Sequence, residues 1–228
     1  MVSRKTSRTM IAADVFSTKP RLTSSDQRKI CTGSAVAGLL ETARLLGENK
    51  PELDYTIELV AYCLEEPPYF ATELMGSYIH AKSLHDKQVN VIGMVCYEMI
   101  GYFSDEPGSQ RFPPLELADS LPTVGNFILT IGGKQNEKFS RKFRDLMAVL
   151  SNVDVFNISF PEESPFFELA CLSDHSNYWR FGFDAFMLND TSFLRNPNYH
   201  QESDTIDTLD FDKMREVVSG AYYAIVHQ

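Results

Sequence analysis

Basic residues are scarce in this sequence. It has 21 Lys and Arg against 31 Asp and Glu, a formal net charge of −10 and a pI near 5.0. Nucleic acids and anionic membranes are bound by basic faces, so the charge argues against both as partners. No run is long and apolar enough to span a bilayer, and the N-terminal residues lack the apolar core of a signal peptide. We therefore expect a soluble chain located in the cytoplasm.

Cysteines are also few, and their spacing matches no metal or redox motif. The four cysteines include no CxxC pair, so no disulfide framework is implied. Cys63 and Cys96 fall in apolar runs and are expected to be buried free thiols. At 43% hydrophobic and 23% charged residues the composition is that of an ordinary globular protein, and residues 1–228 are expected to form one domain. The oligomeric state stays open.

Short apolar runs alternate with helical patterns along the chain, which is typical of a three-layer α/β domain. The polar segments 17–32 and 101–124 are expected to be loops, and a loop as long as the second is usually functional. The strands are expected at 9–16, 57–64, 89–97, 126–131, 153–160 and 185–188, and the helices at 34–46, from Thr72 or Ser77 to about Asp86, at 136–150 and at 211–226.

The most informative stretch runs from Ile57 to Pro68. An apolar strand is followed by Glu65 and Glu66 and then by two prolines, which lack the N–H that a sheet needs. The two carboxylates therefore lie at the carboxyl end of a central strand, where open α/β sheets place their ligands. Since successive side chains point to opposite sides, one can be a metal ligand and the other a base. The alternative is a solvated pair that caps the strand.

Other polar groups follow other expected elements. Glu98 ends the strand 89–97, Asp174 and His175 lie in a Ser-Asp-His triplet, and Tyr199 and His200 lie in a late loop. Carboxylates and imidazole drawn from several strand ends suit zinc or a similar ion. Three further histidines are expected to lie outside any site, the first two on a helix surface: His80, His85 and His227.

Five segments match the motifs of one family in the same order. They are 33–41 (family pattern N-A-S-G-V-A-x-L-L-E), 65–77 (E-E…G-S), 98–102 (D/E-M-I-G-Y), 173–175 (S-D-H) and 199–205 (Y-H…D-T). In these segments the chain resembles the M28 zinc peptidases, aminopeptidase-type exopeptidases with a pair of catalytic zinc ions. The resemblance implies an α/β/α sandwich with a mixed, mostly parallel sheet, and hydrolysis of N-terminal peptide bonds by metal-activated water.

The resemblance also implies roles for the matching residues. Glu65 aligns with the general base, Glu66 and His200 with the ligands of one zinc, and Glu98 with the carboxylate ligand of the other. Zinc lowers the pKa of bound water to about 7, and a nearby carboxylate can then pass the proton to the leaving amine. The residues expected on the substrate side of the site are Asp174, His175 and Tyr199.

Two positions depart from the family pattern. Cys31 stands where the family has its bridging aspartate, and Asp14 stands where it has its first histidine ligand. A Cys–His–carboxylate set suits one tetrahedral zinc. Because two family ligands are replaced, the number of bound ions can be one, two or none. The family's first strand and helix also have no counterpart before Asp14, which suggests a domain that lacks them.

Three functions are compatible with this pattern. The first is a zinc aminopeptidase acting on peptide or aminoacyl substrates, and the second is an inactive homologue that binds peptides or proteins through the old cleft. The third is a single-zinc transferase like glutaminyl cyclase, although Cys31 at the Asp position counts against it. Without metal, carboxylates in a low-dielectric cleft repel each other, so at least one should have a raised pKa or a basic partner. Aromatic residues expected to line the cleft of an inactive homologue are Tyr69, Phe70, Tyr178 and Trp179.

Overall fold

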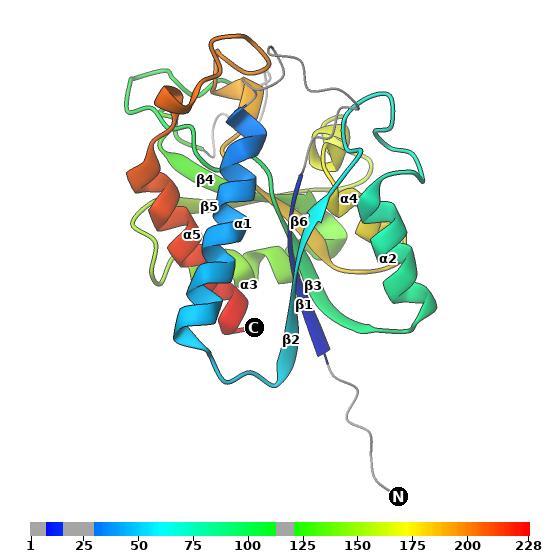
Figure 1. Cartoon of the computed structure of the whole chain (residues 1–228). Helices are drawn as coiled ribbons and strands as arrows, with labels where there is room; N and C mark the ends of the chain where they lie inside the picture. The colour runs from blue at the N-terminus through cyan, green and yellow to red at the C-terminus, as the bar shows by residue number, and fades with distance from the viewer. Residues whose placement is uncertain (1–7, 16–29, 113–120) are drawn as a thin grey trace, which may run out of the picture.

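The computed structural model describes residues 8–15, 30–112 and 121–228, with a six-stranded sheet between two layers of helices (Figure 1). The strands are β1 (Arg8–Val15), β2 (Tyr55–Tyr62), β3 (Asn90–Tyr97), β4 (Phe127–Gly133), β5 (Asp154–Phe160) and β6 (Ala185–Asn189). The α-helices are α1 (Ile30–Asn49), α2 (Gly76–Asp86), α3 (Glu137–Met147), α4 (His175–Trp179) and α5 (Phe211–Val226). None of these helices is long and apolar enough to cross a membrane.

The sheet has the order β2-β1-β3-β6-β4-β5. β1 is parallel to β2 and β3, and β6 is parallel to β3, whereas β4 runs antiparallel to β6 and parallel to β5. Helices α1, α3 and α5 cover one face, and α2 and α4 cover the other (Figure 1). The predicted α/β/α sandwich with a mixed, mostly parallel sheet is therefore confirmed.

The core divides into two apolar clusters, one on each face of the sheet. The middle of β1, residues 10–13, is completely buried, because helices cover both of its faces and it lies between two strands. On one face, Phe143 of α3 packs against Phe186 of β6 with ring centroids 5.0 Å apart. Burying one such ring stabilises the fold by about 1.5–3 kcal/mol. Apolar burial on both faces of the sheet therefore holds β1 and β3 in its middle.

Helix α5 has the bounds that its apolar spacing predicted. Asp210 precedes the helix and its carboxylate accepts a hydrogen bond from the backbone N–H of Lys213 at 2.9 Å, which satisfies one of the free donors of the first turn. The buried face repeats at intervals of three and four residues and packs against α1 and α3. Its members are Met214, Val217, Val218, Gly220, Ala221, Ala224 and Ile225.

The second strand was predicted two residues too late. β2 ends at Tyr62, and Leu64 has a backbone φ of 64°, a conformation that no strand contains. Cys63 therefore lies outside the sheet and is exposed, not buried as expected, whereas Cys96 in β3 is buried. The prediction failed because the apolar residues continue to Leu64, beyond the end of β2, and composition alone does not show where the backbone turns.

The first two helices also differ from their predicted bounds. Helix α1 begins at Ile30, inside the predicted loop 17–32, of which residues 17–29 lie outside the described part of the chain. Gly47 lies within α1, which continues to Asn49 before Pro51. Helix α2 begins after Met75, and neither proposed cap, Thr72 or Ser77, fills that role.

A test of the packing is the substitution Gly93→Ala in β3. A Cβ atom at this position would lie 2.2 Å from the ring of Phe139, far inside van der Waals contact. We expect a loss of about 1–3 kcal/mol in the free energy of unfolding, measured by urea denaturation. Gly47→Ala is the matched control, because a Cβ there meets nothing within 4 Å and alanine favours a helix. Equal stability of the two variants would contradict this packing.

Candidate functional site

The predicted acidic residues gather at one edge of the sheet. Since β1, β2 and β3 are parallel neighbours, their carboxyl ends lie side by side. Asp14 is the last residue but one of β1 and pairs in register with Tyr97 of β3. Glu65 and Glu66 follow β2 in a short loop, and Glu98 directly follows β3. The strand order thus brings together carboxylates from three separate parts of the chain.

Glu66 and His200 are the one predicted carboxylate–imidazole ligand pair that the structure places within ion-pair distance. His200 Nε2 lies 3.9 Å from Glu66 Oε1. The His200 ring stacks on that of Tyr199, with centroids 3.9 Å apart and planes at 15°. His200 also has a positive backbone φ of 59°, which turns the chain sharply at this point. Glu66 and His200, 134 positions apart in sequence, therefore meet through the loop after β6.

Glu98 and Glu65 have raised pKa values. Glu98 is 8% exposed; burial, followed by the charge of Asp174, raises its pKa to about 8 although Ser173 donates to Glu98 Oε2 at 2.7 Å. Burial and then the charge of Glu98 raise the pKa of Glu65 to about 9. This is the behaviour expected of a carboxylate cluster without a cation, because each added negative charge destabilises the others.

Asp174 and Asp14 are completely buried carboxylates. Ser77 donates a hydrogen bond to Asp174 Oδ1, and Asn177 in turn donates to Ser77 Oγ at 2.9 Å. Among the described residues, Asp174 Oδ2 has no hydrogen-bond partner, and neither oxygen of Asp14 accepts a hydrogen bond from another residue. Burial raises the pKa of Asp174 to about 7 and that of Asp14 to about 6. Both side chains therefore leave acceptor capacity unused inside the protein, which is costly unless a cation or proton is present.

His175 is fully buried at the start of α4. Its Nε2 lies 2.7 Å from the carbonyl oxygen of Ala170, and its ring meets the Trp179 ring edge-on at 4.9 Å. The hydrogen bond to a carbonyl requires Nε2–H, and burial lowers the pKa of His175 to about 4. These contacts hold α4 in place. Substrate contact by His175, like that by Asp174 and Tyr199, stays a prediction.

His80 was expected on the surface of its helix, but its side chain is half-buried where α2 faces β2. Its Nδ1 lies 2.8 Å from the Tyr62 hydroxyl and 2.7 Å from the Tyr178 hydroxyl, while its Nε2 lies 3.4 Å from Glu58. These contacts tie the end of β2, just before Glu65, to α2 and α4. His85, by contrast, is exposed as predicted, with a side-chain exposure of 58%. The one sequence feature that could have indicated a polar contact here is the spacing of Glu58 and Tyr62, which places both side chains on the same side of the strand.

The sequence also gave no indication of the role of Asp190. This buried carboxylate accepts backbone N–H groups of Tyr102 at 2.8 Å and Gly101 at 3.2 Å, and of Ser192 at 3.0 Å. It therefore fixes the turn that follows Glu98. Asp190 directly follows β6, at the same edge as Glu98. This position at the end of a strand is the one sequence feature from which its place near the site could have been predicted.

The donor types at this edge fit a divalent cation, but the ligand set is incomplete. Glu66 and His200 supply a carboxylate and an imidazole 3.9 Å apart, and Asp14 supplies buried oxygens with unused acceptor capacity. Yet among the described residues no three His, Cys, Asp or Glu side chains form a group that could hold a metal ion. Cys31 belongs to the first turn of α1, and its side chain lies outside the described part of the structure. The ligand roles of Cys31, Glu98 and Asp14 stay predictions.

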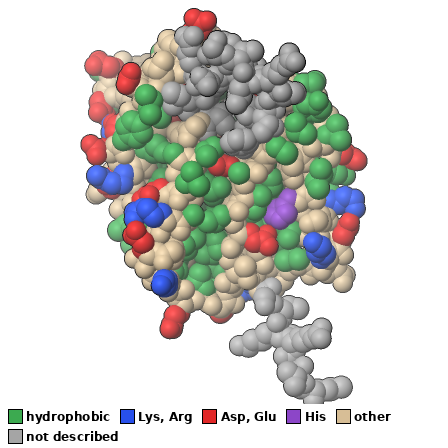
Figure 2. Space-filling view, viewed as in Figure 1, with side chains coloured by type: hydrophobic (Ala, Val, Ile, Leu, Met, Phe, Trp, Pro, Cys, Tyr) green, Lys and Arg blue, Asp and Glu red, His purple; other side chains and the backbone are tan. Residues whose placement is uncertain are grey.

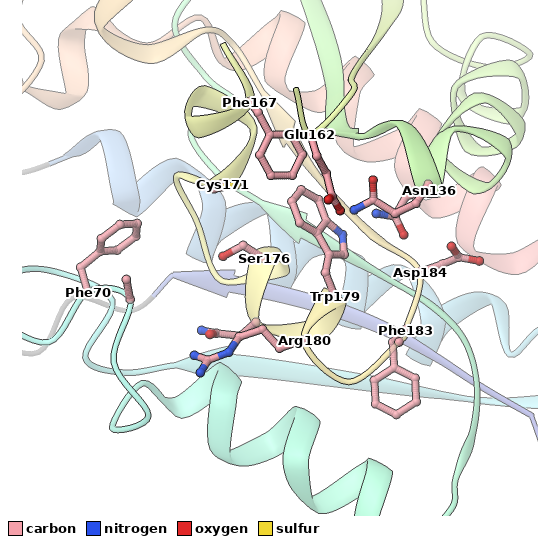
Figure 3. Close-up of a pocket in the computed structure, with 14 residues that line it drawn as sticks. Phe70, Asn136, Glu162, Phe167, Cys171, Ser176, Trp179, Arg180, Phe183 and Asp184 are labelled. Atoms are coloured by element: carbon pink, nitrogen blue, oxygen red, sulfur yellow. The ribbon is translucent and has the colours of Figure 1, made fainter. Parts of the chain in front are cut away.

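A separate cavity of about 710 Å³ lies beside α4, and none of the predicted catalytic residues or metal ligands lines it (Figure 3). Phe70 and Trp179 line this cavity, with Trp179 6.0 Å from the ring of Phe167. Tyr178, expected to line a cleft, is instead completely buried, and Tyr69 does not belong to this cavity. The aromatic surface is therefore displaced from the carboxylates.

Comparison with known proteins agrees with this geometry. A model of peptidase family M28 matches residues 32–225. This chain belongs to peptidase family M28. The matching segment contains Glu65, Glu66, Glu98 and His200, and it begins just after Cys31. Residues 14 and 31, which were predicted to depart from the family pattern, lie outside the part that the family model matches, and their departure stays a prediction.

Similar proteins include one sequence relative and several solved structures. The M28 chain is 40% identical over 187 residues to the uncharacterized protein YfbL of Escherichia coli K12, covering 82% of this chain and 55% of that protein. Its fold is similar to that of the LapA aminopeptidase of Legionella pneumophila (TM-score 0.70, 18% identity, 97% of this chain and 52% of the other). A glutaminyl cyclase of Bacteroides thetaiotaomicron is also similar in fold (TM-score 0.62, 15% identity, 99% and 75%). The chain spans about half the length of YfbL and LapA.

The low pKa of His175 predicts a loss of stability in acid. The folded state holds this imidazole neutral down to about pH 4, whereas the unfolded chain protonates it near pH 6.5. The unfolded state then binds more protons, so stability falls as pH falls from about 6.5 to 4, by about 3 kcal/mol. His175→Gln keeps a donor for the Ala170 carbonyl and should flatten this part of the pH profile of urea unfolding. The same decrease of stability between about pH 6.5 and 4 in His175→Gln as in the parent chain would contradict the low pKa of His175.

The two raised glutamate pKa values predict the opposite slope for the metal-free chain. In EDTA, folded Glu65 and Glu98 keep their protons to about pH 9 and 8, whereas the unfolded chain releases them near pH 4.5. The folded state therefore binds more protons in this window, and its stability falls as pH rises from about 5 to 8. Glu65→Gln should reduce that slope in urea unfolding, and Glu202→Gln, in an exposed turn, is the control. An identical slope of stability against pH in the parent chain, Glu65→Gln and Glu202→Gln would contradict the clustering of these carboxylates.

Proposed function

We propose that this M28 peptidase family member is an aminopeptidase that removes N-terminal residues from peptides and uses one zinc ion. The observation that supports this is the meeting of Glu66 and His200 beside the two carboxyl groups with raised pKa values, Glu65 and Glu98. The fold likeness to zinc aminopeptidases, such as that of Bacillus subtilis (TM-score 0.67, 15% identity), is consistent with this class. Aminopeptidase activity and zinc dependence are the two parts of the proposal that need tests.

In this proposal the zinc ligands are Glu66, His200 and Cys31. A carboxylate, an imidazole and a thiolate leave one position of a tetrahedral ion for water. The first turn of α1, which contains Cys31, packs against the same edge, because the Ser34 hydroxyl accepts the backbone N–H of Ile100 at 3.1 Å. When bound, zinc supplies the Lewis acidity that makes water nucleophilic near neutral pH and stabilises negative charge on the carbonyl oxygen.

Glu65 is the proposed general base. It lies next to Glu66, and its high pKa in the metal-free chain reflects burial and the charges of Glu98, Asp174 and Glu66. A cation held by Glu66 would lower this pKa towards the neutral range, where a carboxylate can both take a proton from water and give it to the leaving amine. Ser173 and Ser77 then act as positioning residues, since they hold Glu98 and Asp174 through hydrogen bonds.

The zinc content of the purified chain tests the proposal most directly. We expect about one equivalent, lost in His200→Ala and kept in the control His227→Ala, because His227 lies at the far end of α5. Glu65→Gln should keep the zinc and lower kcat for an aminoacyl p-nitroanilide by about 10²–10⁴-fold, the usual contribution of a general base. Hydrolysis that survives both substitutions would remove these residues from the mechanism.

A specific observation also favours the inactive homologue. No three donors converge in the described residues. The predicted departure of Asp14 and Cys31 from the family's ligand pattern is consistent with this function. A chain that takes up no zinc even after soaking, and yet binds unhydrolysed peptide, would establish this second function. Binding would be measured by fluorescence anisotropy of a labelled peptide with Phe70→Ala as the variant, because Phe70 lines the aromatic cavity.

A further inference from the structure

Arg195 is a buried cation in the segment between β6 and α5. Lys and Arg side chains are scattered over the face of the molecule that Figure 2 shows, whereas Arg195 is 3% exposed. Burial lowers the pKa of its guanidinium to about 10, although the charge of Asp190 acts in the opposite direction. Its Nη2 has no hydrogen-bond partner among the described residues. Burying such a cation is costly, so the contacts that it does make indicate what the fold gains from it.

The Arg195 side chain joins three separate segments of the chain. Its Nε donates to Gln110 Oε1 at 2.9 Å, and its Nη1 donates to the carbonyl oxygens of Tyr102 at 3.3 Å and Phe127 at 2.8 Å. The guanidinium carbon also lies 4.5 Å from the centre of the Phe127 ring, within the range of a cation–π contact. One planar guanidinium therefore ties the segment after β6 to the segment after Glu98 and to the start of β4.

Gly125 leaves the space that this side chain needs. A Cβ atom at Gly125 would lie 2.8 Å from both Cδ and Nε of Arg195, inside van der Waals contact. The backbone of Gly125 is held in place as well, because its N–H donates to Ser109 Oγ at 2.8 Å and its carbonyl accepts the N–H of Ser104 at 2.9 Å. A side chain at position 125 would therefore displace the guanidinium from its acceptors.

The guanidinium holds a segment that contains unfavourable backbone conformations, residues 190–200, called here the His200 loop. Three non-glycine residues of this loop have positive φ values: Thr191 (75°), Ser192 (51°) and His200 (59°). Such values are unfavourable, above all for a β-branched residue, and persist where surrounding contacts enforce them. The Thr191 hydroxyl donates to Gln110 Oε1 at 3.0 Å, so the acceptor of the guanidinium also anchors the start of the loop.

The connection from Arg195 to His200 is short and has little conformational freedom. The backbone N–H of Asn198 donates to the side-chain oxygen of Asn196 at 2.8 Å, which closes a turn. Pro197 lies inside this turn, and its ring fixes its φ. A shift of the backbone at Arg195 is therefore transmitted to the imidazole of His200.

We propose that Arg195 is a positioning residue for His200. By joining the His200 loop to the segment after Glu98, it holds the imidazole opposite Glu66, with His200 Nε2 3.9 Å from Glu66 Oε1. Asp190, the first residue of the loop, strengthens the same junction, because its carboxylate accepts two backbone N–H groups of that segment. The consequence for zinc rests on the proposed function, whereas the placement of the loop does not.

Hydrogen exchange of the metal-free chain, followed by mass spectrometry, tests the placement of the loop. Arg195→Lys keeps the charge but not the contacts, because one ammonium group cannot occupy the positions of both Nε and Nη1. We expect amide exchange in residues 191–204 to become at least about tenfold faster, while exchange in β3 and α5 stays as in the parent chain. Arg215→Lys is the matched control, since the Arg215 side chain is 66% exposed on α5. Unchanged exchange in residues 191–204, or equal acceleration along the whole chain, would overturn the proposal.

Gly125→Ala tests the same contact without changing Arg195. The added methyl group displaces the guanidinium, so exchange in residues 191–204 should accelerate as it does in Arg195→Lys, and exchange in β3 and α5 should not. Gly47→Ala is the control, because a Cβ there meets nothing within 4 Å. A folded Gly125→Ala chain with the loop exchange of the parent would contradict the role of Arg195.

Zinc affinity tests the consequence for the site. In the proposed enzyme Arg195→Ala should weaken zinc binding by about 10–100-fold, the usual effect of losing a group that orients a metal ligand. Guanidinium at about 20 mM, far below denaturing concentrations, should restore much of this affinity, whereas urea, which is also planar but uncharged, should not. Zinc affinity unchanged in Arg195→Ala would overturn the positioning role. A parent chain that takes up no zinc would refute the proposed function, and hydrogen exchange in residues 191–204 would still decide the role of Arg195.

Discussion

The structure depends on the cost of placing several carboxylates at one buried edge of the sheet. Asp14, Glu98 and Asp174 are buried, and Glu65 lies beside them. Burying a charged carboxylate costs free energy unless hydrogen bonds, opposite charge or a proton compensate it. Hydrogen bonds compensate only in part, since within the described part of the chain both oxygens of Asp14 and Oδ2 of Asp174 have no partner. In the metal-free chain Glu65 and Glu98, with pKa values of about 9 and 8, hold protons at neutral pH and so reduce the repulsion, and a bound cation would reduce it in their place.

The surrounding residues hold this edge through polar contacts to side chains and backbone. Ser173 and Ser77 each donate to one carboxylate, and Asn177 orients Ser77. Asp190 fixes the turn after Glu98 by accepting backbone N–H groups. These residues come from α2, from α4 and the turn before it, and from the segment after β6, so the edge is held from elements that are far apart in sequence. A network of this kind rigidifies the site before any ligand binds.

The predictable parts of this structure are those that local pattern determines. The spacing of Met214, Val217, Val218 and Ala221 located α5, and the apolar runs located all six strands within a few residues. Helix α4 was missed because five residues are too few to show a helical period. The end of β2 was misplaced because the turn at Leu64 depends on backbone conformation and leaves no mark in the hydrophobic pattern.

The site was predictable in its motif residues and not in its supporting contacts. Glu65, Glu66 and Glu98 follow strands, and parallel strands necessarily end at a common edge. The roles of Asp190 and His80 required knowledge of which side chains pack together, because each contacts residues brought near by the tertiary fold. A lone histidine on a helix gives no sign that Tyr62 and Tyr178 will surround it. Tertiary hydrogen bonds of this kind follow from the fold and not from sequence spacing.

β2 leads directly into Glu65 and Glu66, so whatever holds this strand also positions the two carboxylates. The strand is paired with β1 along its whole length, and its last residue, Tyr62, contacts both His80 and Tyr178. These contacts come from β1, α2 and α4, which are far apart in sequence. The position of the carboxylates is therefore set by the packing of these elements around the end of β2.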